Sequence, residues 1–328
     1  MGKRFISMMI GLLVLSVILS GCGQSASSDK QIVIGVTQIV EHPSLDAAFD
    51  GFKQALEDNG YKEGENVKYD VQIAQGDMNN SQTVANNFVG DKVDLIFANS
   101  TPSAQSALNA TKDIPIIFTS VTDPIGAELV KSFEEPGGNV TGYTDTHPEA
   151  IAQTFDFIIE EMGAKKVGVI YNAGEQNSEV QVEKIKEIAS SAGIEIVEAS
   201  VSTSADVKQA TDSLVGRVDV IYVPKDNTVV SALESVISVA NDKDIPLFVG
   251  ELDSMKKGAI AASGFSYFDL GYSTGLMAIK VLEGAKPSEL PVGVPEELNI
   301  VINTLAAKEQ GVEIKDSWKD LAEFYDGE

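Results

Sequence analysis

Two stretches of the chain share a pattern that restricts the folds open to it. Residues 114–124 read Ile-Pro-Ile-Ile-Phe-Thr-Ser-Val-Thr-Asp-Pro, a short apolar run that ends in hydroxyl side chains. Such a run, bounded by turn residues, is typical of a parallel strand covered on both faces. Residues 245–253 (Ile-Pro-Leu-Phe-Val-Gly-Glu-Leu-Asp) repeat it with carboxylates. Because ligands of open α/β sheets lie beyond the carboxyl ends of the strands, the repeat predicts two similar halves facing one cleft.

The remaining elements support a repeated plan. In the first half, apolar runs predict strands that alternate with helices, at residues 32–36, 67–74, 93–98 and 115–118. The second half matches them with strands at 166–171, 194–201, 218–223 and 246–249. We also expect one helix that follows the strand tip at residues 224–228 and runs to residue 240. Strands are expected at 259–264 and 298–303, the latter the last strand, and a tail with Trp318 packed. The predicted fold class is α/β, with two doubly wound parallel-sheet, Rossmann-like lobes.

The N-terminus has the pattern of a secretory signal. Lys3 and Arg4 precede an uncharged apolar run, too short for a membrane span, which predicts a signal peptide at residues 1–21. The run ends in Leu-Ser-Gly-Cys22, which resembles a bacterial lipobox and implies lipidation of Cys22; the alternative is an incidental cysteine. Residues 22–30 are expected to form a tether. Cys22 is the only cysteine, so no disulfide framework is predicted.

Charge excludes several classes of partner. The chain holds 24 Lys and Arg against 49 Asp and Glu, for a net charge of −25, which argues against nucleic acid as a ligand. Arg217 is the only arginine after residue 4, and it precedes a predicted strand. A site built on arginine for phosphate or dicarboxylate is therefore not expected.

The sequence gives no support to catalysis. The only histidines, His42 and His147, lie in different halves, which argues against a zinc site. No Gly-x-Ser-x-Gly elbow, P-loop or Gly-x-Gly-x-x-Gly motif accompanies a predicted strand. We therefore predict a protein that is not an enzyme and that uses no cofactor and no metal.

Several motifs carry a resemblance to a known family. They are Gln38-x-x-Glu-His-Pro-x-Leu-Asp46, Ala74-Gln-Gly-Asp77, Thr111-Lys-Asp-Ile-Pro-Ile116, Val121-Thr-Asp-Pro124, Pro136-Gly-Gly-Asn-Val-Thr-Gly142, Tyr171-Asn-x-Gly-Glu-x-Asn-Ser178 and Tyr222-Val-Pro-x-Asp-Asn-Thr228. In this order they resemble the ABC transporter substrate-binding proteins that include tryptophan and other aromatic amino-acid binders. The resemblance implies the type I periplasmic-binding-protein fold, in which three segments form the hinge. We expect an N-terminal lobe of residues 31–144 and 266–290 and a C-terminal lobe of 145–265 and 291–328.

The same resemblance implies a function. We expect an extracytoplasmic lipoprotein, anchored to the cell membrane through Cys22, that delivers an amino acid to an ABC permease by cleft closure. The amino acid is expected to be aromatic, tryptophan-like, and the protein to be a monomer. Two alternatives remain open: a receptor of this fold for a branched amino acid, nucleoside or sugar, and a receptor that presents its ligand to a membrane sensor.

An amino-acid zwitterion needs donors for its carboxylate and acceptors for its ammonium group. Hydroxyls and helix N-termini serve an anion, so the expected carboxylate ligands are the polar residues after two strands of the first half: Ser100, Thr101, Thr119, Ser120 and Thr122. The alternative is that these hydroxyls only cap helices or close turns. Asp226 and Glu251, which follow strands of the second half, are the expected ammonium acceptors, although Asp226 also suits an N-cap.

Further contacts are expected from residues at other strand ends. These candidates are Gln38, Glu41, Tyr143, Asn172 and Asn227, with Glu175 as another polar contact. An aromatic ligand favours apolar or aromatic walls, for which Tyr171 and Tyr267 are also candidates. Taken singly, each of these tyrosines suits core or hinge packing better than ligand contact. Asp123 is expected to act as a turn residue or a hinge-side contact.

Overall fold

The structure is a computed structural model that describes residues 31–327, and residues 32–328 form one compact unit. The predicted signal peptide, tether and lipidated Cys22 lie outside the described residues. Between residues 31 and 327, no helix combines the length and the apolar character that a membrane span requires.

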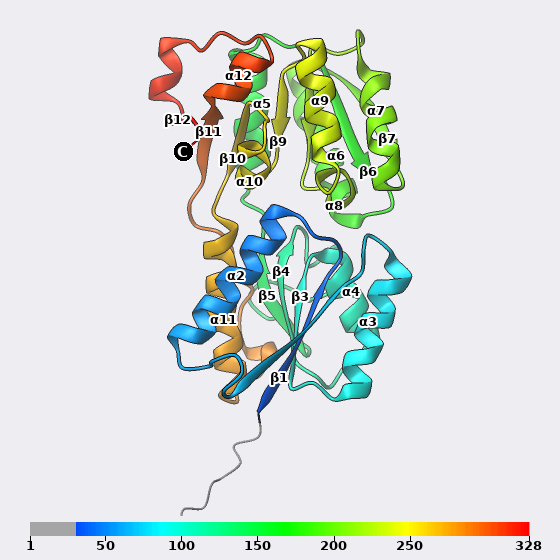
Figure 1. Cartoon of the computed structure of the whole chain (residues 1–328), viewed down its shortest axis with the longest axis vertical. Coiled ribbons are helices and arrows are strands. Elements are labelled where there is room, and N and C mark those ends of the chain that lie inside the picture. The colour runs from blue at the N-terminus through cyan, green and yellow to red at the C-terminus, as the bar shows by residue number, and fades with distance from the viewer. Residues whose placement is uncertain (1–30, 328) are drawn as a thin grey trace, which may run out of the picture. The chain divides into compact units, whose positions relative to one another are not determined.

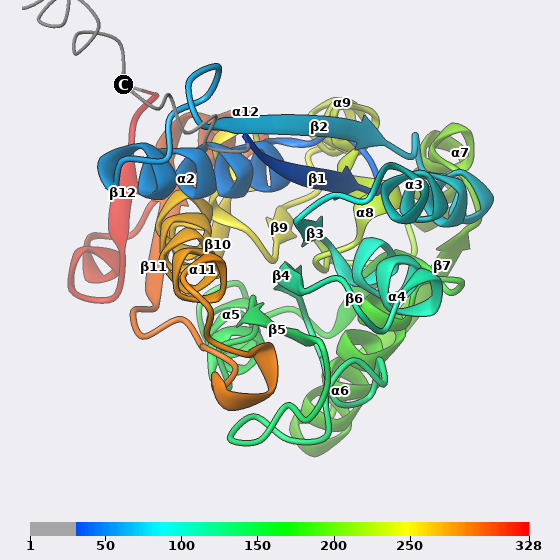
Figure 2. The same ribbon diagram turned by 90° about the horizontal axis from the view of Figure 1, so that it is seen from below.

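The first half folds around a parallel sheet with the strand order β2-β1-β3-β4-β5. Its strands are β1 (Ile32–Gln38), β2 (Val67–Ile73), β3 (Leu95–Asn99), β4 (Ile116–Val121) and β5 (Val140–Thr144). The helices packed on it are α2 (Pro43–Asp58), α3 (Met78–Asp91), α4 (Thr101–Ala110) and α11 (Tyr267–Leu282). In Figures 1 and 2, α2 and α11 cover one face of this sheet, while α3 and α4 lie together on the other. The buried runs of β3 and β4 therefore have helices on both sides, as their continuous apolar sequences predict.

The second half contains a sheet with the order β12-β11-β10-β9-β8-β6-β7. Its strands are β6 (Lys166–Asn172), β7 (Glu195–Val201), β8 (Val220–Val223), β9 (Leu247–Val249), β10 (Ala261–Gly264), β11 (Asn299–Asn303) and β12 (Glu323–Tyr325). Its helices are α5 (Ala150–Glu160), α6 (Gln176–Ala192), α7 (Val207–Leu214), α8 (Asn227–Val230), α9 (Leu233–Lys243), α10 (Leu252–Lys256) and α12 (Thr304–Glu309). Short 3₁₀ turns are η2 (Ser204–Asp206), η3 (Pro287–Glu289) and η4 (Asp316–Asp320). All strand pairs are parallel except β10 with β11, so the predicted α/β class with two parallel-sheet lobes is confirmed.

Two predictions about local structure are wrong, and one helix was missed. The single helix expected up to residue 240 is interrupted at Ala232, whose backbone is not helical (φ −120°, ψ 23°). The strand predicted at 298–303 is not the last, because Glu323–Tyr325 adds β12 beside it. Helix α10 was not predicted at all. The added elements have only three and five residues, too few to show a hydrophobic period.

Glycines allow α2 and α11 to pack very closely. A Cβ at Gly271 would lie 1.8 Å from the Ala48 backbone oxygen, and one at Gly51 would lie 1.9 Å from the Phe268 oxygen. Neither contact leaves room for a side chain. Helix α11, distant in sequence, therefore completes the layer that covers the first sheet.

The tail packs on the second half of the chain. Trp318 is buried, its ring centroid lies 4.9 Å from that of Phe157, and its indole N–H donates to Glu161 at 2.6 Å. The predicted packing role of Trp318 is thus confirmed.

Candidate functional site

Two serines at neighbouring strand ends have unusual backbone conformations. Ser100, which follows β3, has φ 116° and ψ 160°, a region that is otherwise almost restricted to glycine. Ser120, near the end of β4, has φ 57°, in the left-handed region. Both are buried. Non-glycine residues in such conformations cost free energy and concentrate at functional sites, so the two strand ends are candidates for ligand contact.

The same strand ends hold buried polar atoms without partners. Within residues 31–327, Thr101 Oγ1, Ser120 Oγ and Asn99 Oδ1 are buried and make no hydrogen bond. A buried polar group without a partner is costly, which makes these three atoms suited to a polar ligand. Thr122, two positions after Ser120, is also buried. The Thr119 hydroxyl instead accepts a hydrogen bond from Thr274 Oγ1 at 3.2 Å, so it is used within the layer formed with α11.

Gln38 links three segments at the end of β1. Its amide donates to Val40 O at 2.9 Å and to Asp46 Oδ1 at 2.8 Å, and its Oε1 accepts from Asn99 Nδ2 at 2.9 Å. These bonds fix the orientation of Asn99 beside the strained Ser100. The neighbouring Glu41 is exposed.

Glu175 organises a polar cluster in the second half. It is the N-cap residue of α6 and is buried. Its Oε2 accepts from Asn227 Nδ2 at 2.5 Å and its Oε1 from Thr228 Oγ1 at 2.8 Å. Asn172 Nδ2 in turn donates to Thr228 Oγ1 at 2.9 Å. The structure therefore brings together Asn172, Asn227 and Glu175, three residues that the sequence placed at strand ends.

Asp226 lies in the same cluster. It accepts from Asn172 N at 2.6 Å, from Ser178 Oγ at 2.6 Å and, as the N-cap of α8, from Val229 N at 2.7 Å. Burial, with a smaller contribution from the charge of Glu175, raises the pKa of Asp226 to about 7. Its capping role is thus observed, and its carboxyl is held at the edge where β6 and β8 end.

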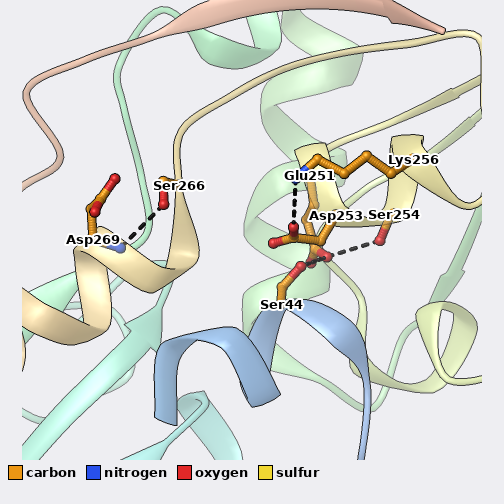
Figure 3. A network of polar contacts seen from close by, with 7 residues as sticks. All are labelled: Ser44, Glu251, Asp253, Ser254, Lys256, Ser266 and Asp269. Atoms are coloured by element: carbon orange, nitrogen blue, oxygen red, sulfur yellow. Dashed lines mark hydrogen bonds and ion pairs between the residues drawn. The ribbon is translucent and has the colours of Figure 1, made fainter. Parts of the chain in front are cut away.

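Glu251 connects the two halves of the chain. It follows β9, and its Oε2 accepts hydrogen bonds from Ser44 Oγ of α2 at 2.5 Å and from Ser254 Oγ at 2.9 Å. Figure 3 shows Ser44 reaching from α2 toward Glu251. This bond joins residues 207 positions apart and is buried. Glu251 is therefore positioned to hold the helix α2 against the second sheet's strand ends.

A third acid lies where the chain leaves the first sheet. Asp145 follows β5, and its Oδ2 accepts from Tyr267 Oη, at the start of α11, at 2.7 Å. Its Oδ1 is buried and has no partner within the described part of the chain. The Lys225 ammonium group donates to the Asp145 backbone oxygen and lies 5.0 Å from the centre of the Phe265 ring. Lys225 thus contacts two of the segments that connect the halves.

The buried carboxylates share one property. Asp145, Glu175, Asp226 and Glu251 are all at least nine-tenths buried, yet between residues 31 and 327 none forms an ion pair with a cationic side chain. Buried acids are normally paired. The same described residues contain no group of three or more His, Cys, Asp and Glu side chains arranged to hold a metal. Their side-chain oxygens accept hydrogen bonds from neutral donors only.

Two cavities border the connecting segments. One, of about 560 Å³, is lined by residues of both halves that include Thr122, Tyr222 and Lys225. The other, of about 800 Å³, is lined by Tyr143 and Phe265, and none of the hydroxyl residues at the ends of β3 and β4 lines it. Burial, and then the charge of Glu296, raises the pKa of the half-buried Tyr143. Tyr143 is thus apart from the strained serines.

The sequence missed four residues of this arrangement: Ser44, Asp145, Tyr222 and Lys225. Tyr222 and Lys225 lie inside the motif Tyr-Val-Pro-Lys-Asp, and Asp145 directly follows β5. Their positions next to strand ends were a usable signal, but their partners lie far away in the chain.

These features define the class of protein. Strained hydroxyl residues lie at the strand ends of one sheet, and unpaired acids lie at the strand ends of the other. A buried hydrogen bond joins the two halves of the chain. This arrangement is that of a two-lobed receptor for a small polar solute. The chain belongs to the ABC transporter substrate binding protein family, whose sequence profile matches residues 33–323. Proteins of this family are extracytoplasmic components of ABC transport systems and partner with a permease.

Individual relatives are similar over nearly the whole chain. A tyrosine-binding protein of Clostridioides difficile is 49% identical over 314 residues, 92% of this chain and 90% of the relative. A Streptococcus pneumonia protein solved in complex with L-Trp is 36% identical with a TM-score of 0.84, covering 90% of this chain and 99% of that one. A Clostridium difficile substrate-binding protein with adhesive properties, in its ligand-free, open form, is 45% identical with a TM-score of 0.66, covering 90% and 100%.

The L-Trp complex and the ligand-free, open structure superpose on this chain to different extents. The more identical protein, solved open, superposes less well than the less identical protein, solved with a ligand. The arrangement described here is therefore nearer to that of the L-Trp complex, in agreement with the buried contact between Ser44 and Glu251.

Proposed function

We propose that this protein binds an aromatic amino acid between its lobes and delivers it to an ABC permease. The observation that carries the proposal is that the two sheets suit opposite charges. Unpartnered hydroxyls, which suit an anion, lie at one sheet, and buried, unpaired acids, which suit a cation, lie at the other. A zwitterion satisfies both. The relatives support an aromatic ligand, since one is a tyrosine-binding protein and another was solved with L-Trp.

The ligand carboxylate is assigned to the ends of β3 and β4. Thr101 Oγ1 and Ser120 Oγ, both without partners in the described chain, supply donors. The free N–H groups at the start of α4 add the positive end of a helix dipole. Ser100 and Thr122 complete this side of the site. Thr119, whose hydroxyl is already engaged, takes a positioning role.

The ligand ammonium group is assigned to the acids of the second half. Glu175 and Asp226 already accept hydrogen bonds from neutral donors only, and neither has a cationic partner within residues 31–327. Asn172 and Asn227 hold the Glu175–Asp226 cluster in place. Glu251 and Asp145 add negative charge near the connecting segments. Gln38, Glu41 and Tyr143 are proposed as peripheral contacts or supports.

Closure of the lobes follows from the assignment of the two ligand charges to different lobes. A ligand that binds one lobe through its carboxylate and the other through its ammonium group prefers the closed arrangement, and so shifts the population toward it. We place the lobe boundaries at residues 31–144 with 266–290 and at 145–265 with 291–328. We further propose that residues 1–21 are a signal peptide, that Cys22 carries the lipid anchor, and that the protein is a monomer without catalytic activity.

Calorimetry with matched ligands tests the proposal. The chain without residues 1–22 retains the whole compact unit of residues 32–328. It should bind tyrosine, tryptophan or phenylalanine, whereas tyramine, which lacks the carboxylate, and 3-(4-hydroxyphenyl)propionate, which lacks the ammonium group, should bind at least tenfold more weakly. Ser120→Ala should weaken tyrosine binding more than tyramine binding. Ser191→Ala, at an exposed position on α6, is the control. Absence of binding by all three aromatic amino acids would overturn the proposed function.

A further inference from the structure

The 560 Å³ cavity is built to receive an apolar group. Its volume is in the range of small-molecule sites, about 300–1,000 Å³. Phe133 from the first half and Ile151, Val180 and Tyr222 from the second line it, so an occupant contacts both halves. It is continuous with the proposed site, because Thr122 at the end of β4 also lines it.

Tyr222 brings one polar atom to this lining. The residue is 1% exposed, and its ring packs edge-on against Phe155 with centroids 5.3 Å apart. Within residues 31–327 its hydroxyl forms no hydrogen bond. Burial raises the pKa of Tyr222, so the hydroxyl stays protonated and able both to donate and to accept. Because Tyr222 lines the cavity, its unpartnered hydroxyl is available to a polar atom of a ligand there.

Gly250 is a neighbour of this hydroxyl in the cavity lining. A Cβ at Gly250, which also lines the cavity, would lie 3.4 Å from the Tyr222 hydroxyl oxygen and 3.1 Å from Lys225 Cγ. Gly250 thus lies at contact distance from the hydroxyl, and a side chain there would press first on Lys225.

We infer that this cavity receives the aromatic ring of the ligand, and that the Tyr222 hydroxyl hydrogen-bonds the polar atom of that ring. That atom is the phenol oxygen of tyrosine or the indole N–H of tryptophan. The inference rests on the proposed function and adds the residue that selects a polar ring over phenylalanine. A site that hydrogen-bonds a ligand hydroxyl rejects the analogue that lacks it, because its own polar group is then left unpaired.

The test is a cycle of two ligands and two proteins. Calorimetry with the chain lacking residues 1–22 should show that the wild type prefers tyrosine to phenylalanine, or tryptophan to 3-(3-benzothienyl)alanine, in which sulfur replaces the N–H, by about 3- to 10-fold. Tyr222→Phe should bring that ratio close to 1 by weakening only the polar ligand. The control is Tyr272→Phe, whose hydroxyl already donates to Asp58 at 3.1 Å and which does not line the cavity; it should keep the wild-type ratio.

A second variant tests the cavity itself. Val180→Trp should fill it and weaken binding of every aromatic amino acid at least tenfold, whereas Ile188→Trp, on the same helix but outside the cavity, should not. The inference fails if the wild type shows no preference for the polar ring, if Tyr222→Phe leaves the ratio unchanged or weakens both ligands equally, or if Val180→Trp leaves affinity intact. Each of these outcomes still allows aromatic binding elsewhere in the cleft. If no aromatic amino acid binds the wild type, the proposed function fails with it.

Discussion

Backbone strain at Ser100 gives the most direct test of the site geometry. With φ 116° and ψ 160°, Ser100 occupies a region that costs a non-glycine residue about 1–3 kcal/mol. Glycine at this position removes that strain, whereas alanine keeps it. Both changes remove the side-chain oxygen that accepts from Ser103 N at 3.4 Å, a long and therefore weak cap.

The magnitude follows from comparison with an ordinary N-cap. At such a position, alanine costs about 1 kcal/mol and glycine only a few tenths, so glycine is the more stable by about 0.5–1 kcal/mol. Relief of strain at Ser100 adds about 1–3 kcal/mol to that difference. We therefore expect Ser100→Gly to exceed Ser100→Ala in free energy of unfolding by about 1.5–4 kcal/mol.

Urea unfolding of the ligand-free chain, followed by circular dichroism, measures this difference. Asp77, the N-cap of α3 with φ −106°, is the matched control, because its backbone is unstrained. Asp77→Gly and Asp77→Ala should differ by only about 0.5–1 kcal/mol. If the glycine–alanine difference is no larger at residue 100 than at residue 77, the reasoning about strain is refuted.

Three further predictions concern packing, the joint between the lobes and pH. Gly271→Ala forces a methyl group against the Ala48 backbone and should lower the free energy of unfolding by about 3 kcal/mol or more. Gly90→Ala, in a helix with open space around it, should raise that free energy by about 0.5–1 kcal/mol. Urea unfolding of both variants measures the two changes. Ser44→Ala leaves the buried carboxyl across the joint with one donor fewer, so calorimetry should show about tenfold weaker binding of the amino-acid ligand; unchanged affinity would contradict a role in closure. Because burial raises the pKa of Asp226 to about 7, the folded state holds a proton that the unfolded state releases near pH 4. Its contribution to stability is therefore complete below about pH 4 and is lost as the pH rises to about 7, by up to about 4 kcal/mol, and Asp226→Asn should remove that slope from a series of denaturation curves.

Local chemistry was sufficient to predict much of the fold and part of the candidate site. The apolar runs that end in Ser100 and Ser120 indicated buried parallel strands with polar ends, and both serines lie there in strained conformations. Asp226 was placed correctly at a strand end, where it caps α8. These outcomes depend only on residues a few positions apart.

What escaped prediction depends on contacts between distant segments. Lys225 reaches the Asp145 backbone 80 residues earlier, and Ser44 reaches Glu251 207 residues later. Neither pairing leaves a local pattern. Tyr222 is an ordinary strand residue by its sequence, and only the cavity beside it distinguishes its hydroxyl. The contacts with a ligand, the lobe boundaries and the N-terminal lipid anchor remain predictions.

The place of α11 in the fold has a consequence for biosynthesis. This helix supplies Ala278, Ile279 and Val281 to the core that contains Phe52 and Leu56 of α2. A ribosome makes the first sheet long before it makes α11, and the strands of the second sheet up to β10 come in between. Until α11 emerges, the apolar side of α2 that packs against α11 has no cover, so the N-terminal portion cannot complete its core as the chain elongates. We therefore expect the nascent chain to stay incompletely folded until nearly 280 residues have been made, which keeps it in a state that an export channel for unfolded polypeptides can accept.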